Sequence, residues 1–557
     1  MWGRRARPAS RFSHAYLAHG LLLAIVLLVC GAAPVRTEYV SAVQPNRAHC
    51  RIFLHATQTQ TRFLLLESYA DQDGVDIYDD FPVVDAALTR LPLDDVYKRL
   101  RSSFLLIQEF LLSRAKPLVI EPRHCHTHLM ASGAAMRAPE LRAQLDTVYE
   151  RIHQETMEDA QFPFLLARED LRTVPADLQG YFHAVGANYL DGKIAATLTP
   201  GTMELVGVLN LQNDELAMVF DSEERWRRSK RYKHIPLNAS DFFSREYEGY
   251  GRNAVSDAIA LQLRKKQEKK MEHPCLFSGY NHHTESGDVE LTGRGDANKC
   301  INEIQSYVDK GNEGCSEGSF CVLNGRAQAR LPGFFYGVGL LRSVVQFTKK
   351  VLQTKQSQDA SVHSLQLPTP TLAALRSAAN TLCATPFVFF EDANLVYGRD
   401  NSDRVKAASP DACFDLCYTI VLLKQFGMLE DDERVFFASP MENASAVVAS
   451  SAPKQTSHDD ATWLTGAYLY LEAIQQRRNF AMEAELLAVQ VTEGVPIGFN
   501  LSVLVLAAAI VFLYASTGAK RPSSRGTYQR VINGAGKAKH ESMCSTQAIV
   551  FVDDASE

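Results

Sequence analysis

The sequence predicts a mixed α/β protein that has more than one domain and is attached to a membrane. Its 557 residues are too many for a single hydrophobic core. Strand and helix patterns alternate: 48–66 reads as two strands around a polar turn, and Pro139–Glu155 repeats apolar residues every three or four positions. A run without charged residues, Gly494–Ala519, is long enough to cross a bilayer as a helix.

The composition excludes two classes of protein. With 46% hydrophobic and 22% charged residues, the chain is globular and not intrinsically disordered. Its formal net charge of −6 lacks the basic footprint of a protein that binds phosphate backbones, so we expect no nucleic-acid partner.

The N-terminal segment 1–33 predicts entry into the secretory pathway. Arginines cluster in Met1–Arg11, and an apolar run, Leu17–Ala33, follows them. The small residues Cys30–Ala33 permit cleavage, so the segment is either a signal peptide or a signal anchor.

The second apolar run predicts a transmembrane helix at 495–517. Lys520 and Arg521 follow it, and the positive-inside rule places the tail, 518–557, in the cytoplasm. The intervening ectodomain is then lumenal or extracellular, in the Golgi or at the plasma membrane.

Cysteines and sequons are consistent with this compartment. Of 11 cysteines, all but Cys30 and Cys544 lie in the ectodomain, which leaves an odd number there. No CxxC spacing predicts a zinc site, so disulfides are expected. Asn238 and Asn443 begin glycosylation sequons, whereas Asn500 lies too close to the bilayer.

Five stretches, taken in order, carry a resemblance to a known family. They read RIFLHATQTQTRFLLL, LMASGAAMR, LQGYFHAVGANYLDG, GVLNLQNDELAMVF and GYGRNA, and they begin at Arg51, Leu129, Leu178, Gly207 and Gly249. Together they resemble the apyrase, or ecto-nucleoside triphosphate diphosphohydrolase, family. The resemblance extends over most of the ectodomain.

The resemblance implies a two-lobed, actin-like (RNase-H-like) ectodomain with a mixed sheet in each lobe. The first lobe would comprise 48–187 and be completed by 455–492, and the second would comprise 188–454. No sequence repeat is visible, although such a fold contains a structural one.

The resemblance also implies phosphate-binding residues. The first family loop, Asp-Ala-Gly-Ser-Thr/Ser-Gly-Thr/Ser-Arg, is HATQTQTR here, which keeps Thr59, Thr61 and Arg62 as predicted phosphate ligands. In the second loop Arg137 is kept as a phosphate ligand. His55 stands where the family has its metal-side Asp.

Two positions of the family's machinery are altered. The register set by Gly180 and the Asn-Tyr-Leu-x-Gly motif places Gln179 on the catalytic Glu. An amide cannot accept a proton from water at neutral pH, so Gln179 is predicted to be inactive as a base. Asn210 stands at the second metal-side Asp.

The fourth motif departs most from the family. Gln212 and Asn213 replace two glycines, and Asp214 and Glu215 place negative charge where a triphosphate would lie. At about 4 Å and an effective dielectric near 20, each like-charge contact costs on the order of 4 kcal/mol.

Cofactor and partners depend on whether the chain is active. A working enzyme would use a divalent cation, Ca²⁺ or Mg²⁺, to hydrolyse nucleoside di- and triphosphates, although no metal ligand is predicted at the family positions that His55 and Asn210 occupy. A catalytically inactive apyrase-fold pseudoenzyme would instead act as a scaffold for an unknown protein partner. An unrelated receptor-like protein with accidental similarity is the third alternative.

The resemblance further implies three disulfides, Cys275–Cys300, Cys315–Cys321 and Cys383–Cys413. Cys50, Cys125 and Cys417 stay unassigned. Cys50 and Cys125 each lead into one of the first two loops, which would allow a bridge between adjacent strands.

Overall fold

The computed structural model describes residues 48–476. The gaps in this range are 70–73, 115–119, 202–203, 223–235, 267–269, 284–289, 312–320, 327–330, 332, 360–361, 394, 396, 398–409 and 439–461. Within the described part, no helix has the length and apolarity needed to span a bilayer. The segments predicted at 1–33, 495–517 and 518–557 lie outside it and stay predictions.

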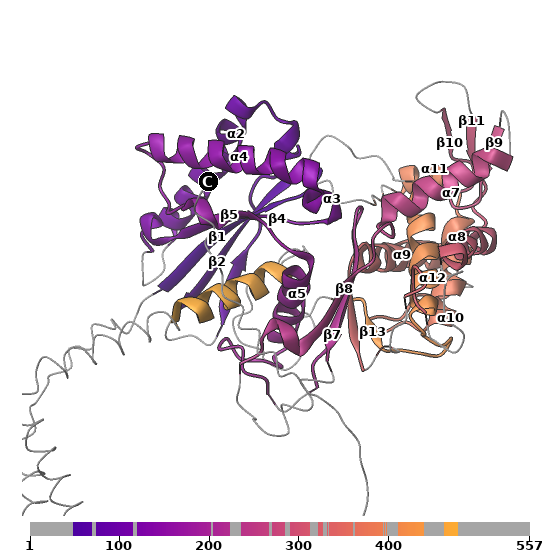
Figure 1. Ribbon diagram of the computed structural model, residues 1–557. Coiled ribbons are helices and arrows are strands. Elements are labelled where there is room, and N and C mark those ends of the chain that lie inside the picture. Colours follow the sequence, from indigo (N-terminus) through magenta and orange to yellow (C-terminus); the bar gives the residue numbers. More distant parts are fainter. Residues whose placement is uncertain are drawn as a thin grey trace, which may run out of the picture. The chain divides into compact units, whose positions relative to one another are not determined.

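The first sheet has five strands in the order β3-β2-β1-β4-β5 (Figure 1). β1, β2 and β3 are antiparallel neighbours, whereas β4 and β5 continue the sheet in parallel from β1. The strands are β1 (Ala48–Ala56), β2 (Thr61–Tyr69), β3 (Val75–Tyr78), β4 (His126–Ala131) and β5 (Leu171–Thr173).

The second sheet repeats this topology in the order β8-β7-β6-β12-β13. β8, β7 and β6 are antiparallel neighbours, and β12 and β13 continue the sheet in parallel from β6. The strands are β6 (Gly207–Leu211), β7 (Leu216–Asp221), β8 (Phe242–Glu246), β12 (Phe335–Gly339) and β13 (Val435–Phe436). The prediction of a mixed α/β fold with two sheets of one topology is therefore confirmed.

Helices α2 (Leu93–Ser113) and α4 (Pro139–Glu158) cover one face of the first sheet. Buried side chains recur along α2 at Val96, Leu100 and Phe104, which is the spacing of one helical face. They form one core with alternate residues of β1 and β2.

A second core joins the two sheets. Helix α5 (Ala176–Leu190) and the helix 462–476, drawn in yellow-orange in Figure 1, each contribute five of its buried residues. The motif that begins at Leu178 is thus helical through Leu190. Gly186 within it allows close contact, because a Cβ added there would lie 1.8 Å from the carbonyl oxygen of Thr462.

The remaining elements lie around these layers, mostly beside the second sheet. The α-helices are α3 (Ala134–Arg137), α7 (Arg252–Lys266), α8 (Ala297–Gly311), α9 (Leu340–Gln356), α10 (Leu372–Cys383), α11 (Phe387–Asp392) and α12 (Ala412–Gln425). A small sheet has the order β10-β11-β9, from β9 (Lys270–His273), β10 (Asn281–His283) and β11 (Glu290–Gly293). Short 3₁₀ turns are η1 (Leu88–Arg90), η2 (Pro122–His124), η3 (Arg168–Asp170) and η4 (Ala239–Asp241).

Buried ionic contacts attach the helix 462–476 to the first sheet. Arg51 on β1 donates from Nε to Glu472 Oε1 at 2.7 Å and from Nη2 to Gln475 Oε1 at 2.8 Å. Because α5 contacts β6, β7 and β8, it belongs as much to the second sheet as to the first. The lobe boundaries at 187–188 and 454–455 stay predictions.

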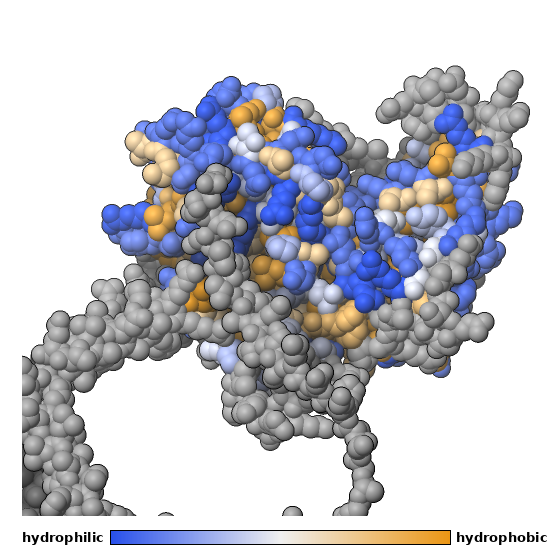
Figure 2. All heavy atoms as spheres, in the orientation of Figure 1, coloured by the Kyte–Doolittle hydropathy of each residue, from blue (hydrophilic) through white to orange (hydrophobic). Residues whose placement is uncertain are grey.

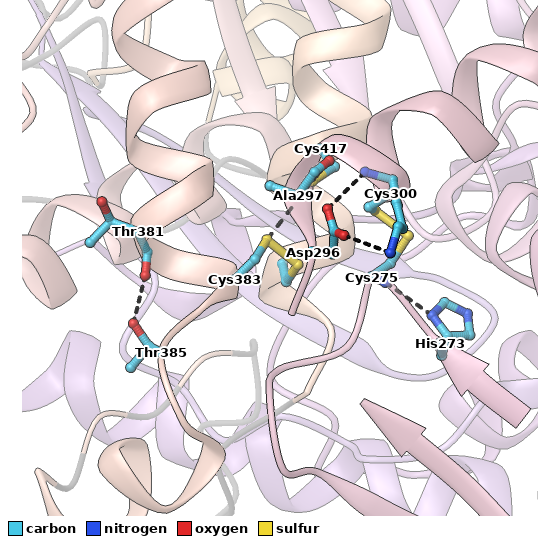
Figure 3. Close-up of a disulfide and its surroundings, with 11 residues drawn as sticks. His273, Cys275, Asp296, Ala297, Cys300, Thr381, Cys383, Thr385 and Cys417 are labelled. Carbon is cyan, nitrogen blue, oxygen red and sulfur yellow. Dashed lines mark hydrogen bonds and ion pairs between the residues drawn. A yellow bond between two sulfur atoms is a disulfide. The ribbon is translucent and has the colours of Figure 1, made fainter. Parts of the chain in front are cut away.

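The disulfides follow the predicted pairing wherever both cysteines are described. Figure 3 shows the Cys275–Cys300 bridge and also Cys383, which is bonded to Cys413, with Cys417 close by. Cys315 lies outside the described residues, so its bridge to Cys321 stays a prediction.

The structure also assigns two cysteines that the sequence left open. Cys50 is bonded to Cys125, which joins β1 to the start of β4. Cys417 is the free cysteine among the described residues, and it is buried.

The described surface is mostly hydrophilic on the face shown in Figure 2, and its apolar residues form separate small patches. Scattered exposed apolar residues are normal on a soluble domain.

We predict that Gly466→Ala destabilises the protein by about 1–3 kcal/mol. The new Cβ would lie 2.0 Å from the backbone oxygen of Phe182, so the two helices must separate. Gly74→Ala is the control, because nothing lies within 4 Å of its added Cβ. Urea unfolding measures both, and equal stabilities would contradict the close packing of the helices.

Candidate active site

The motif residues surround one cavity of about 590 Å³. Its walls come from the β1–β2 turn, the β4–α3 turn, α5, the β6–β7 turn, the first residues of α7, one face of α9, and α12. Trp463 from the helix 462–476 completes the lining. Segments that are far apart in sequence therefore meet at one place, as the order of the motifs predicted.

The predicted site residues divide into two groups. Gln179, His55, Asn210 and Thr59 line the cavity. Thr61, Arg62 and Arg137 are not part of its lining: Thr61 and Arg62 are buried at the start of β2, and Arg137 lies at the end of α3. Their predicted phosphate-binding roles stay predictions.

The Arg137 guanidinium holds Gln179 in place. Arg137 Nη1 donates to Gln179 Oε1 at 2.8 Å and to the backbone oxygen of Val174 at 3.3 Å. Its Nη2 donates to Glu215 Oε2 at 2.8 Å and to Glu246 Oε2 at 2.7 Å. Gln179 is 4% exposed, and its carbonyl oxygen accepts this bond from a cation.

Glu215 is a strongly perturbed carboxyl group of the cavity. Burial raises its pKa to about 7, and the nearby carboxylate of Glu246 acts in the same direction, whereas Arg137 opposes the rise. Glu215 Oε1 also accepts a hydrogen bond from Asn210 Nδ2 at 3.3 Å. The group therefore exchanges its proton near neutral pH.

The two metal-side positions bond to their neighbours. His55 Nε2 lies 2.6 Å from Ser132 Oγ, and Gln212 Nε2 donates to Asn210 Oδ1 at 2.9 Å. An imidazole and an amide are a poor donor set for Ca²⁺ or Mg²⁺, which bind carboxylate-rich oxygen sites. These residues do not fit the family's cation, and we derive no step through one.

In the described part of the chain, no three acidic side chains of the cavity lie close enough together to hold a cation in place of this donor set. Among the described residues, the group of three or more possible ligand side chains is Cys383, Cys413 and Cys417. Two of these sulfurs already form a disulfide.

The sequence reasoning missed a charged cluster on the second-lobe side of the cavity. Arg252 pairs with Asp411 Oδ2 at 2.6 Å and Asp415 Oδ1 at 3.1 Å. Tyr397 donates to Asp415 Oδ2 at 2.7 Å. A signal was available, because Asp415 is a charged residue inside the otherwise apolar, buried helix α12.

A family model matches residues 106–481, which is more than half of the chain. This chain belongs to the GDA1/CD39 (nucleoside phosphatase) family. The resemblance of its motifs to apyrases is thereby confirmed. The match begins within α2, so the β1–β2 turn with His55 lies outside it.

A curated relative and two solved structures are similar to this family member. A probable apyrase 7 of Arabidopsis thaliana is 27% identical over 135 residues, covering 22% of this chain and 18% of the relative. A nucleoside triphosphate hydrolase structure from Neospora caninum has a TM-score of 0.48 at 11% identity, covering 83% of this chain and 97% of that one. The structure of a PPX-GPPA enzyme from Aquifex aeolicus has a TM-score of 0.34 at 11% identity, covering 72% of this chain and 99% of that one.

We predict that Glu215→Gln changes how stability depends on pH. The pKa of Glu215 is about 7 when folded and 4.5 at its ordinary value, so the folded state binds the extra proton between these pH values. The stability that protonated Glu215 contributes, at most about 3 kcal/mol, is thus fully present below pH 4.5 and is lost as the pH rises through 7.

Urea unfolding of both proteins at pH 5 and pH 7.5 measures this effect. The wild type should lose more unfolding free energy between the two pH values than Glu215→Gln does. Parallel pH profiles would contradict the raised pKa.

Proposed function

We propose that this nucleoside phosphatase family member is membrane-attached and, unaided, hydrolyses nucleoside di- and triphosphates slowly or not at all. The observation that carries the proposal is Gln179, an amide at the position of the family's general base, bonded through Oε1 to Arg137. Removing a positioned base typically costs about 10²- to 10⁴-fold in rate.

The other acids at the cavity do not replace this base easily. Glu215 is paired with Arg137, and Asp415 is paired with Arg252 and hydrogen-bonded by Tyr397. Burial raises the pKa of both carboxyl groups, but both oxygens of each accept bonds from neighbouring side chains, so neither group is positioned to take a proton from an attacking water. Hydrolysis in this family also requires a hard divalent cation, and His55 and Asn210 at the metal-side positions are poor ligands for one.

Cysteine usage and an exposed sequon support placement of the ectodomain in the lumen or outside the cell. Three disulfides join cysteines of the described region, and such bonds persist in oxidising compartments. Asn238 is exposed at the surface just before η4. The predicted helix 495–517 would hold this domain at the membrane.

We expect full-length protein in detergent to release phosphate from ATP, ADP, GDP and UDP well below the ordinary enzymatic range of about 1–10³ s⁻¹, in Ca²⁺ and in Mg²⁺. Gln179→Glu alone should recover little, because Asp214 and Glu215 stay in the cavity. Turnover by the wild type within that range would overturn the proposal.

We also expect an N-linked glycan on Asn238 when the full chain is made in secretory cells. Treatment with a peptide-N-glycosidase should increase gel mobility, and Asn238→Gln should make this shift smaller by one glycan. A chain whose mobility does not change after treatment would contradict the lumenal or extracellular placement.

A further inference from the structure

The turn between β6 and β7, Gln212–Glu215, reaches the phosphate-loop position of the first lobe. Asp214 Oδ2 accepts a hydrogen bond from the backbone N–H of Ala135 at 3.3 Å. Gly133 has a φ of 104°, and a Cβ added there would lie 2.5 Å from Asp214 Oδ2. The carboxylate thus occupies space that only a glycine leaves open.

The same turn is held from its other side by the start of α7. The N–H of Arg252 donates to Gln212 O at 3.0 Å, and the N–H of Asn253 donates to Asn213 O at 2.8 Å. A Cβ added to Gly251 would lie 2.3 Å from the backbone carbon of Asp214. Backbone donors at a helix start usually serve an anion or a cap, and here they serve this turn.

The second acid of the turn forms an ion pair with a guanidinium group of the first lobe. Glu215 is 3% exposed and pairs with Arg137 at 2.8 Å. Asp214 and Glu215 together, called the acidic pair below, therefore engage one backbone donor and one cation of the first lobe.

We propose that the acidic pair is an internal anion that occupies the phosphate-binding donors of the first lobe and so determines the charge of ligand that the cavity accepts. A phosphate group would have to displace the Asp214 carboxylate from Ala135 and compete with Glu215 for Arg137. It would also approach the negative charge of Asp214 at short range and, above pH 7, that of Glu215. The acidic pair excludes anions both by occupation and by repulsion.

This proposal goes beyond slow hydrolysis, which concerns the proton acceptor at Gln179. The acidic pair acts on binding. The test of this proposal therefore measures the binding of a ligand without turnover. The result for binding and the result for hydrolysis are then independent of each other.

The test is a calorimetric titration of full-length protein in detergent with inorganic pyrophosphate. In the variant Asp214→Ala/Glu215→Gln, the first substitution removes the carboxylate that accepts from Ala135. The second removes the charge of Glu215, while the new amide oxygen can still accept a hydrogen bond from Arg137. We expect it to bind pyrophosphate at least about tenfold more tightly than the wild type, with the gain falling as salt is raised.

Asp85→Asn is the matched control, because it removes a carboxylate of the cavity wall and leaves the turn intact. It should stay close to the wild type. Three results would overturn the proposal: an equal gain in Asp85→Asn, tight pyrophosphate binding by the wild type, or no gain in a folded double variant.

A second measurement applies if the double variant does not fold. The Gly133→Ala substitution should lower the melting temperature more when it is made in the wild type than when it is made in the Asp214→Ala variant. The added methyl group meets Asp214 Oδ2 only in the wild-type background. Equal losses in the two backgrounds would show that Asp214 does not occupy the turn and would also overturn the proposal.

Discussion

The hydrogen bonds of the Arg137 guanidinium connect the two sheets at the cavity. Its acceptors come from α5 (Gln179), the β6–β7 turn (Glu215), β8 (Glu246) and the segment that precedes α5. A largely buried cation needs such partners, because removing one side of a buried pair typically costs about 3–5 kcal/mol. The position of the base-site amide and the placement of the acidic turn both depend on this one side chain.

The meeting of distant motifs could be predicted from the sequence, because it requires only their order and the fold they imply. His55, Gln179 and Asn210 do lie around one cavity. The side-chain partners could not be predicted in the same way. Glu246, a partner of Arg137, is 109 residues away and belongs to no motif, so only the pairing of β7 with β8 brings it near.

The matched residues Thr61 and Arg62 show a limit in reading structural position from a motif. They agree with the family by letter, yet both begin β2 and are buried there, and Thr61 pairs through its backbone with Val84. The disulfide between Cys50 and Cys125 shows the same limit. Spacing alone leaves the pairing open, whereas the parallel register of Arg51 with His126 places the two preceding cysteines side by side.

The substituted positions of the cavity bond to one another, and this explains why they are compatible with a stable fold. His55 contacts Ser132, Gln212 donates to Asn210, and Asn210 donates to Glu215. A working active site instead keeps polar groups directed at an absent ligand, which costs stability.

Each of these replacements supplies a partner within the protein for a group that would otherwise await substrate or metal. A single reversion at such a site would therefore leave the neighbouring polar groups unpaired. If hydrolysis is slow as proposed, restoring it requires several positions to change together, because Gln179, Arg137, Glu215 and Asn210 are parts of one hydrogen-bonded network.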